Sequence, residues 1–98
     1  MKRILIIEDE QAIVDIATII LEDEGYEVSS LTEFAEYESK LRDCNADLVL
    51  LDLNLGKFHG KDICKYIKGD NHLKQTAVVL MSANKDIKTI KEEAGADA

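Results

Sequence analysis

The chain has 98 residues, of which 46% are hydrophobic and 33% charged, which fits one compact domain and excludes a two-domain enzyme or a disordered chain. Its formal net charge of -8 argues against direct nucleic-acid binding, because the negative field of the chain repels phosphate groups. No apolar run reaches about 18 residues, and Glu8, Asp9 and Glu10 interrupt the apolar N-terminus. The sequence therefore predicts no membrane span, no signal peptide and a cytoplasmic location.

The first half of the chain alternates between strand-like and helix-like patterns. Residues 3–7 form a short β-branched run, typical of a parallel strand that is covered on both faces. From Gln11 the apolar residues recur with helical spacing, and Gly25 is placed to end this helix in a left-handed conformation. Residues 26–31 predict a more polar strand near a sheet edge, and the apolar spacing within residues 34–41 predicts a second helix. The apolar stripe of the first helix comprises Ile13, Ile16, Ala17, Ile20 and Leu21.

The middle of the chain carries its most apolar run, residues 48–51, which predicts a central strand that ends at Asp52. A loop containing Gly56 and Gly60 follows, and a third helix then ends at Gly69. Four lysines are interpreted as a solvated face along this helix: Lys57, Lys61, Lys65 and Lys68.

The last part of the chain repeats the pattern, with a fourth strand over residues 77–81 and a fourth helix that Asp86 begins and Gly95 ends. Four strand–helix units in series predict an α/β fold, with a parallel sheet, right-handed crossovers and helices on both faces. Residues 96–98 lie where a fifth strand would begin, so we expect the architecture to be interrupted there.

Chemically active side chains follow three of the predicted strands. Glu8 and Asp9 follow the first strand, Asp52 the third and Ser82 the fourth. Open α/β sheets bind ligands at the carboxyl ends of their strands, so these side chains are predicted to converge. Three carboxylates a few ångströms apart repel one another, so either their pKa values rise or a hard cation such as Mg²⁺ joins them. The alternative, that each acid is an ordinary strand-end or helix-capping residue, is weakened because three occur together.

Four motifs, in this order and at this spacing, resemble the receiver domain of two-component response regulators, including the chemotaxis regulators. The resemblance covers residues 2–98 and implies a flavodoxin-like, doubly wound parallel sheet of strand order 2-1-3-4-5, with the fifth strand and last helix missing from this chain. The motifs are Ile4-Leu5-Ile6-Ile7-Glu8-Asp9-Glu10, Asp47-Leu48-Val49-Leu50-Leu51-Asp52-Leu53-Asn54-Leu55 with Gly60, Val78-Val79-Leu80-Met81-Ser82-Ala83, and Gly95-Ala96-Asp97-Ala98.

The resemblance implies a role for each candidate residue. Asp52 would accept a phosphoryl group from the phosphohistidine of a sensor histidine kinase or a phosphotransfer protein. Asp9 would be the principal Mg²⁺ ligand, with Glu8 acting directly or through water, and Asp52 and the backbone carbonyl of Asn54 as further ligands. Ser82 would be the hydroxyl that turns toward the phosphoryl group and reports it to an output surface. On this interpretation residues 1–98 are a regulatory phosphoacceptor domain and not an enzyme.

Three departures from the family pattern bear on this interpretation. Gly56 stands where the family usually has proline, His59 precedes the expected Gly60, and the chain ends before the family's lysine at the end of the fifth strand. We therefore expect one sheet edge to be unpaired and one apolar flank uncovered. The prediction is that residues 1–98 are incomplete at the C-terminus or complete their sheet by association, as a homodimer or a domain-swapped oligomer.

Two other functions compete with the phosphoacceptor hypothesis. The first is a receiver-like interaction module that no longer transfers phosphate. The second is a phosphohydrolase with an aspartyl-phosphate intermediate, which is disfavoured because such enzymes carry Asp-x-Asp after the first strand, where this chain has Glu8-Asp9-Glu10. His59 is interpreted as an ordinary loop histidine. Cys44 and Cys64 are interpreted as small hydrophobic residues in preference to a redox pair.

Overall fold

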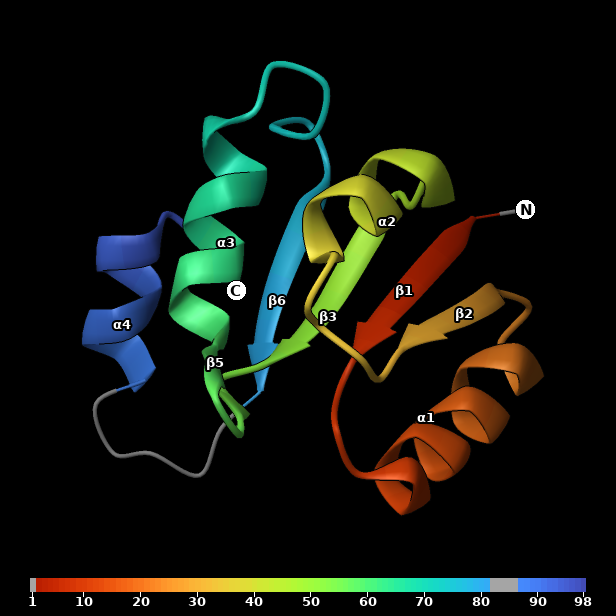
Figure 1. Cartoon of the computed structure of the whole chain (residues 1–98). Helices are drawn as coiled ribbons and strands as arrows, with labels where there is room; N and C mark the ends of the chain where they lie inside the picture. Colours follow the sequence, from red (N-terminus) through yellow and green to blue (C-terminus); the bar gives the residue numbers. More distant parts are fainter. Residues whose placement is uncertain (1, 82–86) are drawn as a thin grey trace.

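The computed structural model describes residues 2–81 and 87–98 of the chain. These residues form a parallel sheet flanked by helices, with a short antiparallel hairpin after the third strand (Figure 1). The sheet has the order β2-β1-β3-β6, which confirms the predicted order 2-1-3-4 and the doubly wound α/β class. None of the described helices is long and apolar enough to cross a membrane. The elements are β1 (Arg3–Ile7), α1 (Gln11–Asp23), β2 (Glu27–Leu31), α2 (Tyr37–Cys44), β3 (Leu48–Asp52), β4 (Asn54–Leu55), β5 (Phe58–His59), α3 (Gly60–Gly69), β6 (Ala77–Met81) and α4 (Ile87–Ala94).

The two faces of the sheet pack against different helices, because successive residues of a strand point to opposite sides. In β1, Leu5 and Ile7 belong to the larger core, which includes residues of α2, α3 and α4. Ile4 and Ile6 belong to a smaller core, in which Val14 of α1 is the buried helical residue. The first face is thus well covered, whereas the second is covered by α1 alone among the described helices.

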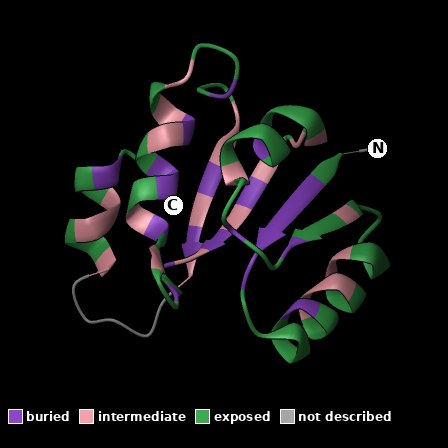
Figure 2. Ribbon diagram, viewed as in Figure 1, coloured by how far each residue is buried: buried purple, intermediate pink, exposed green. Residues whose placement is uncertain are grey.

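Helix α1 exposes much of its apolar stripe. Ala17 and Leu21 pack against the smaller core, as expected. Ile13, Ile16 and Ile20 are instead 40%, 61% and 58% exposed. Figure 2 shows α1 mostly in the colour of exposed residues, in contrast to β1, which is mostly buried. The predicted helix is confirmed, and the outer part of its apolar stripe is exposed because the described residues place nothing against it.

The segment after β3, predicted to be a loop, is a tight β-hairpin. Strands β4 and β5 pair antiparallel, with Gly56 and Lys57 as the two turn residues. Gly56 has φ +67°, which suits the first central residue of a hairpin turn that requires glycine. Lys57 therefore lies in this turn and not along α3. The Phe58 ring meets the ring of Phe34 edge-on, with 5.8 Å between centroids, which ties the hairpin to the segment before α2.

The last residues of the chain lie along the outer edge of β6. The backbone N–H groups of Asp97 and Ala98 both donate to the Val78 carbonyl, at 2.9 and 3.2 Å. The Leu80 N–H donates to the Ala98 carbonyl at 2.9 Å. The expectation of an unpaired edge is therefore wrong for Val78 and Leu80. The predicted helix-capping residue Asp86 lies outside the described residues.

Candidate functional site

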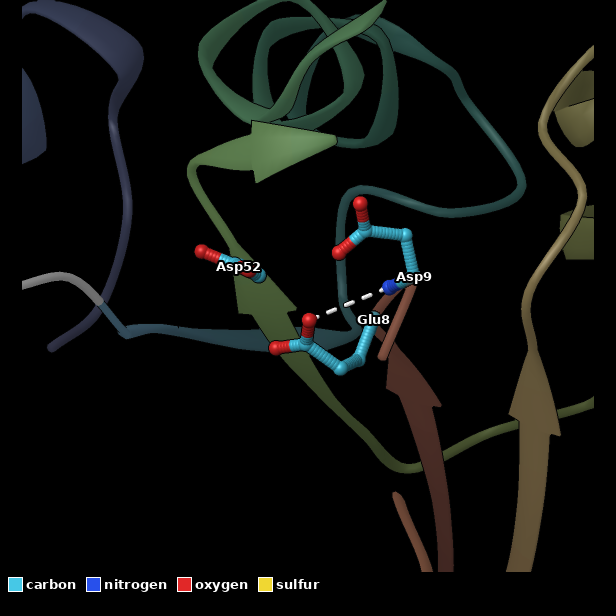
Figure 3. A group of neighbouring side chains, drawn as sticks. All are labelled: Glu8, Asp9 and Asp52. Carbon is cyan, nitrogen blue, oxygen red and sulfur yellow. Dashed lines mark hydrogen bonds between the residues drawn. The ribbon is translucent and has the colours of Figure 1, made fainter. Parts of the chain in front are cut away.

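The candidate site lies at the carboxyl edge of the sheet, where β1 and β3 end side by side. The register pairs Ile7 with Leu51, so the residues that follow each of them are neighbours. Glu8, Asp9 and Asp52 each offer one carboxylate oxygen, and these oxygens all lie within 4.8 Å of one another (Figure 3). The structure therefore brings together the three acidic residues that the sequence singled out.

Glu8 is the buried member of this acidic cluster, with only 3% of its surface exposed. Its Oε1 atom accepts hydrogen bonds from the backbone N–H groups of Asp9, at 3.1 Å, and Glu10, at 3.2 Å. Burial, followed by the neighbouring side chains of Asp52 and Asp9, raises the pKa of Glu8 to about 7. A carboxyl group with such a pKa favours either a proton or a nearby cation at neutral pH.

Asp52 and Asn54 are positioned by the hairpin that follows β3. The Asp52 Oδ1 atom accepts the backbone N–H of Asn54 at 3.1 Å, which orients the carboxylate. The N–H of Gly60 donates to the carbonyl of Leu53 at 3.1 Å. Because hydrogen-bonded and non-bonded pairs alternate in an antiparallel ladder, the next pair, Asn54 with His59, is a non-bonded one. The hairpin ladder thus makes no use of the Asn54 carbonyl, which is the group predicted to bind metal.

Gly60 allows helix α3 to begin directly against the acidic edge. A Cβ atom at this position would overlap the carbonyl oxygen of Asp52 and would lie 2.8 Å from the Cα of Leu53. Any larger residue would have to push α3 away from the end of β3. Sequence reasoning named Gly60 as part of a motif but missed this close approach, for which no local pattern exists.

The donor set of the acidic cluster suits a hard divalent cation. It consists of carboxylate oxygens from three residues, and the Asn54 carbonyl is close in sequence to one of them. Mg²⁺ prefers oxygen ligands and retains several waters, so a cluster of this kind, open on the Asp9 side, fits its needs. Ser82, the predicted switch hydroxyl, lies outside the described residues.

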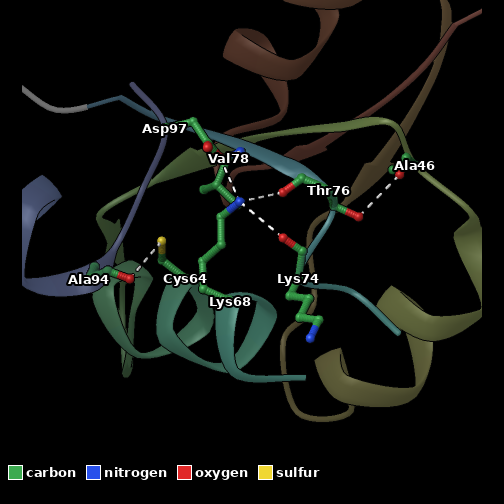
Figure 4. Close-up of polar contacts among 8 residues, drawn as sticks. All are labelled: Ala46, Cys64, Lys68, Lys74, Thr76, Val78, Ala94 and Asp97. Atoms are coloured by element: carbon green, nitrogen blue, oxygen red, sulfur yellow. Dashed lines mark hydrogen bonds and ion pairs between the residues drawn. The ribbon is translucent and has the colours of Figure 1, made fainter. Parts of the chain in front are cut away.

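A second charged cluster, made of two ion pairs, joins α3 to α4 and to the end of the chain. Figure 4 shows the pair at the end of the chain. The Lys68 Nζ atom donates to the carbonyl of Thr76 at 2.7 Å and pairs with the Asp97 carboxylate at 2.6 Å. Lys61 pairs with Glu93. The lysine partners lower the pKa values of both carboxyl groups. Lys68 therefore holds a structural contact, and its interpretation as part of a solvated face is wrong. Lys61 lies in an exposed ion pair and Lys65 is exposed, which agrees with that interpretation.

The two cysteines are free thiols, as the sequence suggests. Cys44 is half-buried, whereas Cys64 is fully buried and donates to the carbonyl of Ala94 at 3.6 Å. Burial raises the pKa of the Cys64 thiol to about 11, so this thiol stays neutral. Their interpretation as small hydrophobic residues fits these surroundings.

Comparison with known proteins agrees with this architecture. The model of the response regulator receiver domain matches residues 4–98, and the chain belongs to that family. It is a receiver domain of two-component signalling, which is a regulatory domain.

The curated relatives are longer proteins. The chain is 30% identical over 85 residues to the DNA-binding response regulator MtrA of Mycolicibacterium smegmatis, covering 87% of this chain and 36% of the relative. It is 32% identical over 97 residues to the sensory transduction protein RegX3 of Mycobacterium bovis, covering 99% of this chain and 42% of the relative. The chain thus spans about two fifths of the length of these relatives.

Solved structures share the fold closely. The receiver domain of the DNA-binding response regulator merR of Colwellia psychrerythraea has a TM-score of 0.89 at 25% identity, over 100% of this chain and 83% of that one. The response regulator TrrA of Thermotoga maritima, determined with Mg²⁺ and BeF, has a TM-score of 0.86 at 29% identity, over 99% and 83%. A further neighbour, the response regulator Rcp1, was determined in a Mn²⁺-bound form and has a TM-score of 0.83 at 27% identity, over 99% and 78%. Divalent-metal binding by the acidic cluster is consistent with these neighbours.

Proposed function

We propose that Asp52 is the phosphoacceptor of this receiver domain and that a divalent cation, Mg²⁺ in the cell, supports the transfer. The observation that carries the proposal is the convergence of three carboxylates within 4.8 Å at the carboxyl edge of a parallel sheet. The fold holds these like charges together without a basic partner among the hydrogen bonds and ion pairs of the described residues. A bound cation would remove their repulsion.

The proposed reaction is a phosphoryl transfer from a phosphohistidine of a partner histidine kinase or phosphotransfer protein. A carboxylate oxygen of Asp52 forms a bond to phosphorus while the phosphorus–nitrogen bond breaks and the imidazole leaves. The hydrogen bond from the Asn54 N–H holds the Asp52 carboxylate in one orientation for this attack. When bound, the cation would neutralise negative charge on the transferring group.

The other residues have supporting roles in the proposal. Asp9 is the principal metal ligand, and Glu8 binds the metal directly or through water. Asp52 and the Asn54 carbonyl complete the protein's share of the coordination. Ser82 is proposed as the hydroxyl that senses the phosphoryl group.

Incubation of the chain with a small phosphodonor such as acetyl phosphate and Mg²⁺ tests the acceptor. We expect intact-mass spectrometry to show one added phosphoryl group, and Asp52→Asn to abolish the addition. Asp15→Asn removes the same charge from the exposed side of α1 and is the matched control, which should be phosphorylated like the parent. Addition that persists in Asp52→Asn, or that requires no Mg²⁺, would contradict the proposal.

Titration calorimetry with Mg²⁺ tests the metal ligands separately from phosphoryl transfer. Asp9→Asn is expected to weaken binding by about tenfold or more, since it removes a charged ligand. Asp15→Asn again serves as the control. Equal affinity in Asp9→Asn and the parent would remove Asp9 from the ligand set.

The two competing functions give different results in the same assays. Rapid multiple turnover of a phosphate ester would support a phosphohydrolase. Absence of both turnover and stable phosphorylation, in a chain that still binds Mg²⁺, would support an interaction module.

A further inference from the structure

Strand β2 forms a free edge of the sheet, on the side where α1 packs. It is the first strand in the order β2-β1-β3-β6, and within residues 2–81 and 87–98 no strand pairs with its outer side (Figure 1). The end of the chain lies along β6, at the opposite edge of the sheet. The width of the sheet therefore separates the β2 edge from the end of the chain.

Two residues of β2 direct their backbone groups away from the sheet. The N–H of Glu27 and the carbonyl of Leu31 both form hydrogen bonds toward β1 and the residues that flank it. Backbone groups point to alternate sides along a strand, so those of Ser29 also face β1, whereas those of Val28 and Ser30 face outward. The edge therefore offers the N–H and carbonyl groups of Val28 and Ser30 to an added strand.

A hollow with a volume of about 540 Å³ lies between this edge and α1. Asp15, Thr18 and Ile19 line it on the helix side, and Val28 and Ser30 line it on the strand side. The Ile19 side chain is 70% exposed and is available for an apolar contact. A segment added beside β2 would place every second side chain toward α1 and Ile19. The outer edge of β2 and this hollow are together called the edge site.

The charges around the edge site indicate what can bind there. Residues 4–39 contain acidic residues but no lysine, arginine or histidine. Arg3, which precedes this range, is already paired with Glu27. Asp15 lines the hollow, and Glu22 is exposed two turns further along the same flank of α1. The edge site is therefore complementary to a segment that carries positive charge.

We propose that the edge site binds an extended basic segment of a partner protein, which adds to the sheet as a strand beside β2. The backbone of this segment bonds to Val28 and Ser30, some of its side chains contact Ile19, and its lysines or arginines face the acids of α1. Pairing with the β2 edge of a second copy is disfavoured, because it would bring two acidic edges together. The edge site uses none of the residues proposed for phosphoryl transfer, so the two proposals can fail separately.

NMR titration of the ¹⁵N-labelled chain with a short peptide of alternating lysine and valine, blocked at both ends, tests the proposal. We expect saturable changes in the amide chemical shifts of Ile19, Val28 and Ser30, and weaker binding as salt is added. The same peptide with glutamate in place of lysine should not bind. Absence of saturable changes at β2, or equal binding of the glutamate peptide, would overturn the proposal.

Two pairs of variants test the backbone contact and the apolar contact. Ser30→Pro removes an outward N–H while leaving the ladder to β1 in place, and it should weaken binding about tenfold. Ser30→Ala keeps the N–H and should bind like the parent. Ile19→Lys places a positive charge in the hollow and should also weaken binding about tenfold. Its matched control is Ile16→Lys, since Ile16 is 61% exposed on the same helix but does not line the hollow.

Circular dichroism checks that every variant is folded, and the Ile19 pair tests the site even if Ser30→Pro does not fold. Equal binding by Ser30→Pro and Ser30→Ala would show that no strand is added at β2 and would overturn the proposal. Equal binding by Ile19→Lys and Ile16→Lys would place the peptide elsewhere, with the same consequence. Concentration-dependent shifts at Ser30 without peptide would assign the edge to a second copy, which also overturns the proposal.

Discussion

The carboxylates in the two charged clusters of this domain have different neighbours, which are other carboxylates in one cluster and lysines in the other. At the carboxyl edge of the sheet, Glu8, Asp9 and Asp52 lie together, and the pKa of Glu8 is raised to about 7. Between α3, α4 and the end of the chain, Glu93 and Asp97 each face a lysine, and their pKa values are lowered. Opposite charges thus pair at the contacts of α3 with α4 and with the end of the chain, whereas like charges lie together at the edge of the sheet, where a cation can bind. The raised pKa of Glu8 accords with a ligand site, whereas the lowered pKa values of Glu93 and Asp97 accord with internal ion pairs.

The largest expected effect comes from Gly60, which lets α3 begin in close contact with the end of β3. Gly60→Ala should lower the free energy of unfolding by about 2 to 3 kcal/mol, because the added Cβ overlaps the carbonyl of Asp52. Gly69→Ala is the matched control on the same helix, since a Cβ there meets nothing within 4 Å. Urea denaturation measures both variants. Equal stabilities of the two variants would show that the approach of α3 to β3 is not tight.

The second-largest expected effect is a pH dependence of the free energy of unfolding, which arises from Glu8 in the acidic cluster. In the unfolded chain Glu8 ionises near its ordinary pKa of 4.5, but in the fold it does so only near 7. Unfolding between these values releases a proton, so metal-free stability should fall as pH rises from about 4.5 to about 7. Glu8→Gln should remove this fall and stabilise the metal-free protein at pH 7 by about 2 kcal/mol.

Denaturation at a series of pH values, in the presence of a chelator, measures this effect. The difference between the parent and Glu8→Gln isolates Glu8 from the other carboxyl groups. A difference that does not change between pH 4.5 and 7 would contradict the raised pKa. Added Mg²⁺ should restore stability to the parent near neutral pH more than to Glu8→Gln.

The paired cluster should show the opposite sign of pH dependence. Asp97 has a lowered pKa, because Lys68 and the Val78 N–H stabilise its charged form. Its contribution is present above its ordinary pKa of 3.8 and is lost as pH falls below that value. Asp97→Asn should therefore destabilise the domain at pH 7 by about 1 kcal/mol or less, because the ion pair is half exposed. The backbone N–H of Val78 donates to the Asp97 carboxylate, so amide hydrogen exchange at Val78 should also become faster in this variant.

The smallest effect separates the two thiols. Cys64 is buried at the contact between α3 and α4, with a pKa raised to about 11, whereas Cys44 is half-buried. A thiol-specific alkylating reagent should modify Cys44 well before Cys64 in the folded domain. Peptide mapping after short exposure measures the order, and the unfolded chain, where both should react at similar rates, is the control. Faster reaction of Cys64 would mean that α4 separates readily from α3.

The sequence by itself determined the order of the strands and helices and the residues at the strand ends. Continuous apolar runs mark buried parallel strands wherever they occur, so the ends at Glu8 and Asp52 could be read without a structure. The meeting of these residues at one edge followed from the topology of parallel α/β sheets. The hairpin after β3 was missed, although its signal, two residues between short strands with glycine first, was present around Gly56.

Only the tertiary structure determined which apolar side chains are covered and which charged side chains form ion pairs. Helical periodicity states which residues share a flank of α1, but the exposure of Ile16 and Ile20 depends on what packs against that flank. Lys68 and Asp97 are far apart in sequence, and they meet because α3 and the end of the chain both pack beside β6. The raised pKa of Glu8 likewise arises from burial and from Asp52, neither of which is a local property. Local pattern specifies the elements, while contacts between distant elements set exposure and charge.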